Sequence, residues 1–224
     1  MNALGCIGRF IVVGMMLPFL IGGCSHFGKK EEKTPAELMS EGMKSFEKGN
    51  YEAAAETFQK VKDRYPYNTF AIIAELKMAD SLYKREVYEE AYDAYDEFER
   101  LHPKNENIPY VIYQKGMSHF QQLKTIDRDQ SHTLKSEEEF ERLVKRFPRD
   151  DYAKRARKNI RKCLVYLAEY ELYVGHFYYK MEKYRAAMAR YTYLMNTYPD
   201  MGQYHEALEY MRRCKEELSK ETRK

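Results

Sequence analysis

Residues 51–66, YEAAAETFQKVKDRYP, contain the pattern that decides the fold of this 224-residue chain. Tyr51, Ala54 and Phe58 supply a large, a small and an aromatic side chain, and Pro66 follows them. Side chains spaced three and four residues apart lie on one face of an α-helix, and proline ends a helix because it has no amide hydrogen to donate. The stretch therefore predicts one amphipathic helix that stops just before Pro66.

The same ladder of four residues occurs three more times along the chain. The further copies are Tyr88, Ala91, Tyr95 and Pro103; Thr133, Ser136, Phe140 and Pro148; and Tyr184, Ala187, Tyr191 and Pro199. The third copy is the weakest match, because Thr133 stands where the others have an aromatic. A small residue with an aromatic four positions later precedes each ladder: Gly42 and Phe46, Ala79 and Tyr83, Gly116 and Phe120, and Gly175 and Tyr179. Each ladder therefore has a partner helix, which the small residue allows to approach closely.

Two helices joined by a short turn and ended by proline are typical of the tetratricopeptide repeat, which has a period of about 34 residues. The repeat-ending prolines are 37, 45 and 51 residues apart, so the later repeats contain additional residues. We expect these in the turn near Lys124 to His132 and in a long helix from about Asp151 to Lys180. The prediction is an all-α tetratricopeptide-repeat superhelix over residues 34–224, with about four helix pairs and a C-terminal capping helix from about Gly202 to Ser219.

The N-terminal segment has the pattern of a targeting signal. A single basic residue, Arg9, is followed by an apolar run at residues 10–21 and then by Gly22-Gly23-Cys24. The run is shorter than the roughly 20 residues that span a bilayer, and a cysteine after small residues indicates a lipoprotein signal. We predict a signal peptide at residues 1–23, acylation of Cys24 with lipid that includes palmitate, and a lipidated flexible tether at residues 24–33. An ordinary cleaved signal and an uncleaved anchor are the alternatives.

Charge and cysteine content narrow the class of protein. The chain has 38 basic and 35 acidic residues, interspersed along its length, and a formal net charge of +3. Such a balance does not favour nonspecific binding to nucleic acid, which depends on clustered positive charge, so we expect no nucleic-acid partner. Beyond the signal and the lipidation site, only Cys163 and Cys214 remain. Spacing alone leaves open whether they pack in the core or form a disulfide.

Motifs for catalysis are absent from the sequence. It has no phosphate-binding glycine-rich loop, no Gly-x-Ser-x-Gly elbow and no His-Glu-x-x-His metal helix. The six histidines are scattered, and no pair has the spacing typical of metal ligands. Residues such as His102 and His119 are better explained by capping or packing, and the acidic run Glu137-Glu138-Glu139 by a position near a helix start. We therefore expect neither an enzyme nor a bound metal or cofactor.

Several short motifs, taken in their order, resemble those of a known family. They are Tyr65-Pro66-Tyr67, Asp127-Arg128-Asp129-Gln130, Arg146-Phe147-Pro148, Ala168-Glu169-Tyr170-Glu171 and Tyr198-Pro199-Asp200. Together with the lipoprotein signal and the repeats, they are similar to the BamD/ComL-like outer-membrane lipoproteins, over nearly the whole mature chain. The resemblance implies a non-catalytic subunit of the β-barrel assembly machine, lipid-anchored at the periplasmic face of the outer membrane.

The resemblance also implies partners and residues that bind them. The expected partners are the periplasmic domain of the membrane-embedded barrel subunit, other assembly lipoproteins and unfolded outer-membrane proteins. Arg190 resembles the family arginine that meets an acidic partner residue, and it could equally be a solvated surface arginine. Arg128 and Asp129 lie in the loop that the resemblance assigns to partner binding.

A receptor for unfolded substrates needs exposed aromatic side chains on a concave face. Tyr65, Tyr67 and Phe70, at the first junction between repeats, could supply a substrate groove, although helix capping and junction packing explain them equally well. The alternative function is a periplasmic envelope scaffold that serves peptidoglycan, secretion or pilus and DNA-uptake machinery. Such a scaffold shares the anchor and the repeats but does not need the arginine dock.

Overall fold

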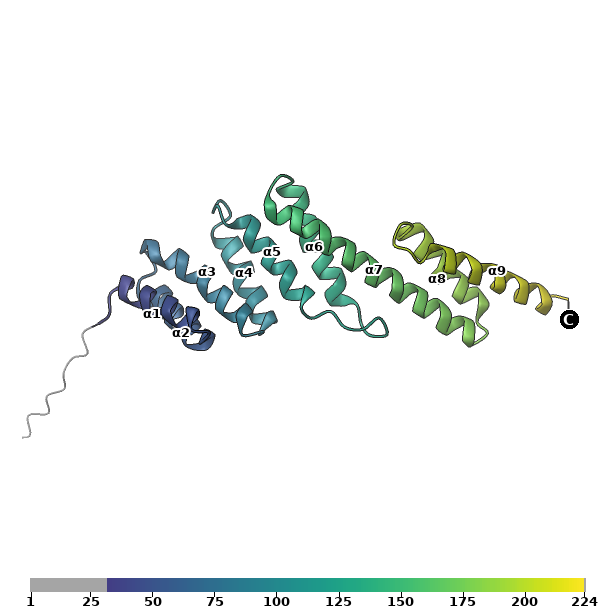
Figure 1. Cartoon of the computed structure of the whole chain (residues 1–224), viewed down its shortest axis with the longest axis horizontal. Coiled ribbons are helices and arrows are strands. Elements are labelled where there is room, and N and C mark those ends of the chain that lie inside the picture. The colour runs from purple at the N-terminus through teal and green to yellow at the C-terminus, as the bar shows by residue number, and fades with distance from the viewer. Residues whose placement is uncertain (1–31, 224) are drawn as a thin grey trace, which may run out of the picture. The chain divides into compact units, whose positions relative to one another are not determined.

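The structure is a computed structural model that describes residues 32–223. Within these residues there are nine α-helices and no strands (Figure 1). The helices are α1 (Pro35–Glu47), α2 (Tyr51–Arg64), α3 (Thr69–Lys84), α4 (Tyr88–Leu101), α5 (Ile108–Phe120), α6 (Ser131–Arg146), α7 (Asp151–Lys180), α8 (Tyr184–Thr197) and α9 (Tyr204–Glu221). The predicted signal peptide, Cys24 and the tether as far as residue 31 lie outside the described residues. None of the nine helices is long and apolar enough to cross a bilayer.

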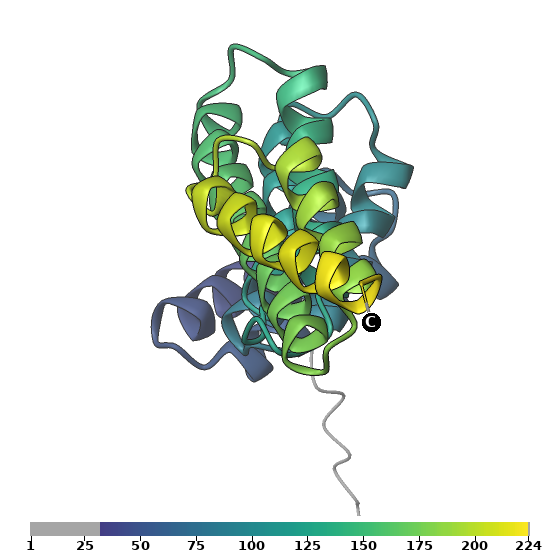
Figure 2. The same cartoon turned by 90° about the vertical axis from the view of Figure 1, so that its right-hand side faces the viewer.

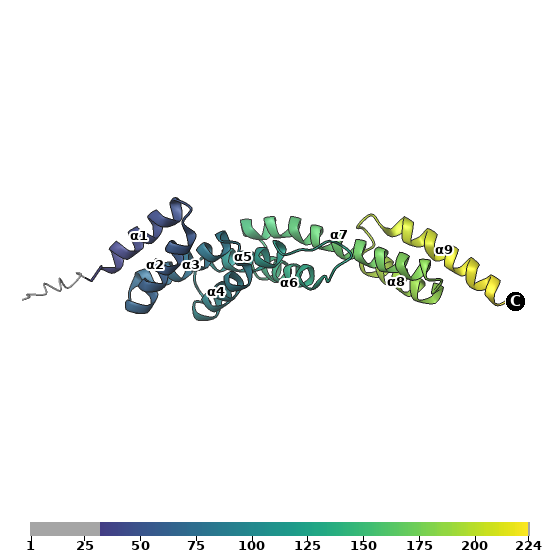
Figure 3. The ribbon, with the colours of Figure 1, turned by 90° about the horizontal axis from the view of Figure 1, so that it is seen from below.

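Each helix packs against the next one along the chain, so that α1 to α8 form four pairs and α9 covers α8 (Figures 1 and 2). The view from below shows the same order (Figure 3). Further contacts join α1 to α3 and α5 to α7. The all-α repeat fold and the capping helix are confirmed, and α7 has the bounds that the proline spacing predicts. The extra residues of the third repeat form a loop at residues 121–130, between α5 and α6.

The aromatic residue at the third position of each ladder is the centre of its helix pair. Phe58, Tyr95, Phe140 and Tyr191 are fully buried, as are the small ladder residues before them. Three of these rings lie directly on a glycine of the partner helix. A Cβ atom added at Gly42 would lie 2.6 Å from the Phe58 ring. The small residue therefore lets the two helices of a repeat approach, as the sequence predicts.

The contact at Gly116 gives a test of this packing. A Cβ atom there would lie 2.6 Å from the ring of Phe140, which is buried in the central core. Alanine is favoured over glycine in a helix by about 1 kcal/mol, but overpacking a core costs about 1–3 kcal/mol. Because a separation of 2.6 Å belongs at the costly end of this range, about 2–3 kcal/mol, we expect Gly116→Ala to lower the free energy of unfolding by a net of about 1–2 kcal/mol in urea titrations. Adding Phe140→Leu should recover part of that loss. An alanine variant as stable as the wild type would contradict the packing argument.

The turn inside a repeat uses one residue in the left-handed region. Gly49, Glu86 and Glu182 have φ values of 77°, 64° and 60° in the first, second and fourth repeats. Their amides donate to the carbonyl oxygens of Phe46, Tyr83 and Tyr179, each at 3.0 Å. Glycine adopts this conformation without steric cost, and other residues pay roughly 1 kcal/mol. The third repeat replaces this turn with the loop at residues 121–130.

The structure corrects one prediction and decides between two alternatives. The run Glu137-Glu138-Glu139 lies in the interior of α6, which begins six residues earlier at Ser131, so it does not serve a helix start. Glu139 is buried in that position. Cys163 and Cys214 are both free and buried, which is the packing alternative and not the disulfide. Burial raises the pKa of the Cys163 thiol to about 11, so this thiol stays protonated at neutral pH.

Candidate functional site

Arg190 lies on α8 and is bound to a carboxylate of α7. Its Nη1 atom donates to Glu171 at 3.4 Å and 3.2 Å. The Glu171 side chain is almost buried, whereas the Arg190 side chain is 41% exposed. The guanidinium therefore has one internal partner and still faces solvent. It is neither a free surface arginine nor a buried structural one.

Two aromatic side chains, Tyr193 and Tyr198, lie near this ion pair. Tyr193, one turn after Arg190 on α8, is 49% exposed. Its ring centroid lies 6.1 Å from that of Tyr198, which is buried. Burial and the neighbouring Tyr193 raise the pKa of Tyr198, so its hydroxyl remains neutral. We call Glu171, Arg190, Tyr193 and Tyr198 the Arg190 surface. It combines an exposed aromatic ring with an arginine fork, the residue types that dominate protein–protein contacts.

A second set of exposed apolar side chains follows α7. Tyr166, Tyr173, Phe177 and Met181 are between 37% and 52% exposed. Their spacing of seven, four and four residues puts them on one stripe of the helix. Glu171 lies on a different side of α7, because it is two residues before Tyr173. The long helix therefore has one face at the Arg190 surface and another that is aromatic and exposed.

The loop at residues 121–130 contains the other predicted partner-binding residues. The Arg128 side chain is 71% exposed and pairs with Asp127 at 3.9 Å. Asp129 accepts a hydrogen bond from the Ser131 hydroxyl, and this bond lowers the pKa of Asp129. Buried Gln130 holds the loop together, since its Nε2 atom donates to the carbonyl oxygens of Thr125 and Arg128 at 3.1 and 3.0 Å. Both predicted residues are exposed on an organised loop.

The three aromatics predicted to form a substrate groove do not share one environment. Tyr67 is fully exposed. Tyr65 donates its hydroxyl to the Lys33 carbonyl oxygen at 2.8 Å, and both Tyr65 and Phe70 pack against the core of α1 to α3. Junction packing therefore accounts for Tyr65 and Phe70. Only Tyr67 presents its ring to solvent.

A cleft that the sequence did not reveal lies between α3 and α5. It has a volume of about 510 Å³, and exposed Ile72 and Ile73 form part of its wall. Asp80 lies in its floor, where it accepts hydrogen bonds from the hydroxyls of Tyr95 at 2.8 Å and Tyr110 at 2.6 Å. The cleft thus combines an isoleucine wall with polar and charged side chains, which include Lys77 and Glu106 beside the hydrogen-bonded Asp80. In the sequence, two adjacent isoleucines outside the ladder positions, Ile72 and Ile73, could have indicated an exposed apolar site here.

Five charged side chains, of which Lys115, Glu99 and Glu139 are largely buried, join three helices in the middle of the chain. The amino group of Lys115 on α5 lies 2.6 Å from Asp96 and 3.3 Å from Glu99, both on α4, and 3.2 Å from Glu139 on α6. Arg142 donates two hydrogen bonds to Glu99, at 2.6 and 2.9 Å. We call these five residues the central charge cluster. Each charge has opposite charges beside it, so the cluster links α4, α5 and α6 without leaving an unpaired buried ion.

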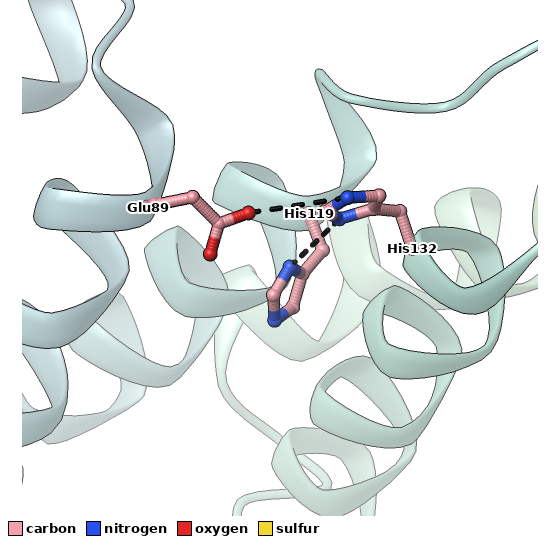
Figure 4. A group of neighbouring side chains, drawn as sticks. All are labelled: Glu89, His119 and His132. Carbon is pink, nitrogen blue, oxygen red and sulfur yellow. Dashed lines mark hydrogen bonds and ion pairs between the residues drawn. The ribbon is translucent and has the colours of Figure 1, made fainter.

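Two histidines also meet, which the sequence analysis did not foresee. The Nδ1 atoms of His119 on α5 and His132 on α6 are 3.3 Å apart. The Nε2 atom of His132 is 3.9 Å from a carboxylate oxygen of Glu89 on α4 (Figure 4). The prediction that the histidines are scattered is therefore wrong for this pair. The repeat fold brings the end of α5 to the start of α6 across the intervening loop.

The model of the YfiO family, described as outer membrane lipoproteins, matches residues 31–224. The chain belongs to this family. A similar protein, the outer membrane protein assembly factor BamD of Rickettsia prowazekii, is 34% identical over 206 residues, covering 90% of this chain and 80% of that protein. The factor of the same name from Vibrio cholerae is 27% identical over 207 residues, covering 88% and 86%. The resemblance expected from the motifs is confirmed.

Solved structures that are similar to this YfiO-family chain have lower identity. MamA from Desulfovibrio magneticus has a TM-score of 0.41 and 16% identity, and covers 73% of this chain and 75% of that one. The TPR2AB domain of yeast Sti1 has a TM-score of 0.46 and 15% identity, and covers 82% and 70%. The fold of this chain is therefore assigned from its own helix pairs and buried ladder residues.

Proposed function

We propose that this chain is a non-catalytic scaffold of the outer-membrane β-barrel assembly machinery. Its partners are the periplasmic domain of the barrel subunit, other assembly lipoproteins and unfolded outer-membrane proteins. Cys24 carries the lipid that anchors it to the periplasmic face of the outer membrane. The observation that carries the proposal is the family match over residues 31–224, together with relatives named as outer membrane protein assembly factors.

The Arg190 surface supports a dock for the barrel subunit. A guanidinium can bind a partner carboxylate through two parallel hydrogen bonds, and Arg190 keeps part of its side chain in solvent while Glu171 orients it from behind. Exposed Tyr193 adds a large apolar contact beside the charge. The partner that fits is therefore a periplasmic domain with an exposed acidic residue next to an apolar one.

The cleft between α3 and α5 supports a site for unfolded substrates. Its isoleucine wall lies shortly after exposed Tyr67 in the chain, so aromatic and aliphatic side chains are available on one repeat. A short extended segment with alternating apolar residues would place every second side chain against such a wall. The site that we propose therefore consists of the cleft and Tyr67, and of the groove predicted from Tyr65, Tyr67 and Phe70 it keeps only Tyr67. The alternative role in peptidoglycan, secretion or pilus machinery has no specific support among these relatives.

Photo-crosslinking in intact cells tests the proposal. A benzophenone amino acid at Tyr193 is expected to capture the barrel subunit, and the same group at Lys154, an exposed position at the start of α7, serves as the control. Depletion of the chain is expected to lower the amount of folded β-barrel protein in the outer membrane. Normal levels of folded barrels after depletion, with no capture from position 193, would contradict the proposal. Mass spectrometry of the N-terminal peptide tests the lipid on Cys24 independently.

A further inference from the structure

Three potential metal ligands converge where α4 begins, α5 ends and α6 begins. Glu89, His119 and His132 each offer one ligand atom, and all three atoms lie within 4.8 Å of one another. Figure 4 shows the Glu89 carboxylate and the His119 ring both facing the His132 ring, each toward a different nitrogen of that ring. Two imidazoles and a carboxylate form a ligand set that suits zinc and related divalent transition metals.

The separation of the two imidazole nitrogens agrees with shared coordination. The Nδ1 atoms are 3.3 Å apart. In a tetrahedral zinc site with Zn–N bonds of about 2.0–2.1 Å, two nitrogen ligands are about 3.3–3.4 Å apart. The rings therefore already have the spacing that the metal requires. A rotation of the Glu89 side chain, which is 59% exposed, is the adjustment that would complete the set.

Packing holds His119 in place, and charges of both signs lie near it. His119 is buried, and its ring lies 4.6 Å from that of Tyr92, so its position is constrained. The end of α5 places partial negative charge beside His119. Of the charged residues near His119, Lys135 would repel a bound cation and Glu139 would attract it. Glu139 is also paired with Lys115 in the central charge cluster.

We propose that Glu89, His119 and His132 bind one zinc ion, which fastens α4, α5 and α6 together at the base of the loop at residues 121–130. His132 is the second residue of α6, directly after Gln130 and Ser131. Buried Gln130 bonds to two carbonyl oxygens of the loop. An ion on His132 would therefore hold the start of α6 against the two preceding helices. Three protein ligands leave one position for water, as in open zinc sites.

Metal titration of the full chain, purified from membranes in detergent, tests the proposal. Calorimetry with zinc chloride is expected to give one equivalent of bound metal, and cobalt substitution a tetrahedral absorption spectrum. Removing a partner of a metal ligand weakens binding by about 10–100-fold, so removing a ligand itself with His132→Ala should weaken it by at least about 100-fold. The matched control is His205→Ala, at an exposed position of α9, which should leave binding unchanged.

Two further variants keep the test decisive. Glu89→Gln changes an exposed side chain without disturbing the core and replaces a charged ligand by a neutral amide, so it should weaken zinc binding by at least about tenfold even if His132→Ala fails to fold. His176→Ala removes the histidine that lies 3.1 Å from Glu206, a separate histidine–carboxylate pair near the C-terminal end. Failure to bind zinc at about 100 μM, or binding that is lost with His176→Ala and kept with Glu89→Gln and His132→Ala, would overturn the proposal.

Discussion

Replacing Lys115 with alanine is expected to lower the free energy of unfolding by about 3–5 kcal/mol, because removing one partner of a buried ion pair leaves the others uncompensated. The Lys115 side chain is only 5% exposed, and Glu99 and Glu139, which face it, are also largely buried. Arg142 would still neutralise part of their charge. Chemical denaturation at pH 7, followed by circular dichroism, measures the loss.

The control for this prediction is Lys154→Ala, because Lys154 pairs with Asp151 at an exposed position of α7. Exposed pairs contribute about 0–1 kcal/mol, so this variant should be nearly as stable as the wild type. The double variant Lys115→Met with Glu139→Gln removes both members of a pair and should recover part of the loss. A Lys115→Ala variant that loses no more than the Lys154→Ala control would show that the central charge cluster adds little to stability.

The stability that the central charge cluster contributes should also depend on pH. Burial raises the pKa of Glu99, but hydrogen bonds and charge from Arg142 and Lys115 outweigh it, so this pKa lies below its usual 4.5. A carboxylate whose pKa is lowered by folding stabilises the protein above its unfolded pKa, and the effect is lost as the pH falls through the folded pKa. The stability gap between wild type and Lys115→Ala should therefore be full at pH 7 and shrink below about pH 4.

Reversing the charge of Arg190 is expected to reduce co-purification of the barrel subunit by at least about tenfold, since truncating a charge pair at an interface costs about 2–5 kcal/mol. Arg190→Glu alone also places a carboxylate beside nearly buried Glu171, with which Arg190 now pairs at 3.2 Å. The double variant Arg190→Glu with Glu171→Gln removes that internal repulsion. It should fold normally and still fail to bind.

Glu171→Gln alone is the variant that separates docking from folding. It weakens the internal ion pair but keeps the exposed guanidinium, so co-purification of the barrel subunit should remain close to the wild-type level. Thermal denaturation measured in parallel would report any loss of stability. If Glu171→Gln reduced binding as strongly as Arg190→Glu, Arg190 would act through α7 and α8 and not through the partner.

The helix pairs were predictable because their determinants are local. Phe58 and Pro66 lie within one helix and its end, and the distance between Pro148 and Pro199 was enough to predict a 30-residue α7. The third ladder lacks the first aromatic residue but still forms a helix pair. Thr133, which takes that position, is buried and donates a hydrogen bond to Gln130 at 2.8 Å. For such residues, the spacing along one helix is sufficient to predict which side chains are buried and where the helix ends.

The charged and histidine clusters could not be predicted in this way, because they depend on the register between helices. Glu99 and Arg142 are 43 residues apart in sequence, yet they form two hydrogen bonds. His119 and His132 are separated by a loop whose path has no periodic pattern. Residues such as Tyr65 and Phe70 were ambiguous for the opposite reason, since an aromatic at a junction can either pack or remain exposed.

The contact of each helix mainly with its neighbours along the chain has a mechanical consequence. In the proposed function the lipid holds the N-terminal end while a partner holds the Arg190 surface near the other end. A force between these two points would pass through the interfaces largely in series, because the contacts that skip a helix, α1 to α3, α4 to α6 and α5 to α7, each bypass only one helix. The resistance of the chain to being pulled apart is therefore set by its weakest interface and not by the sum of all of them.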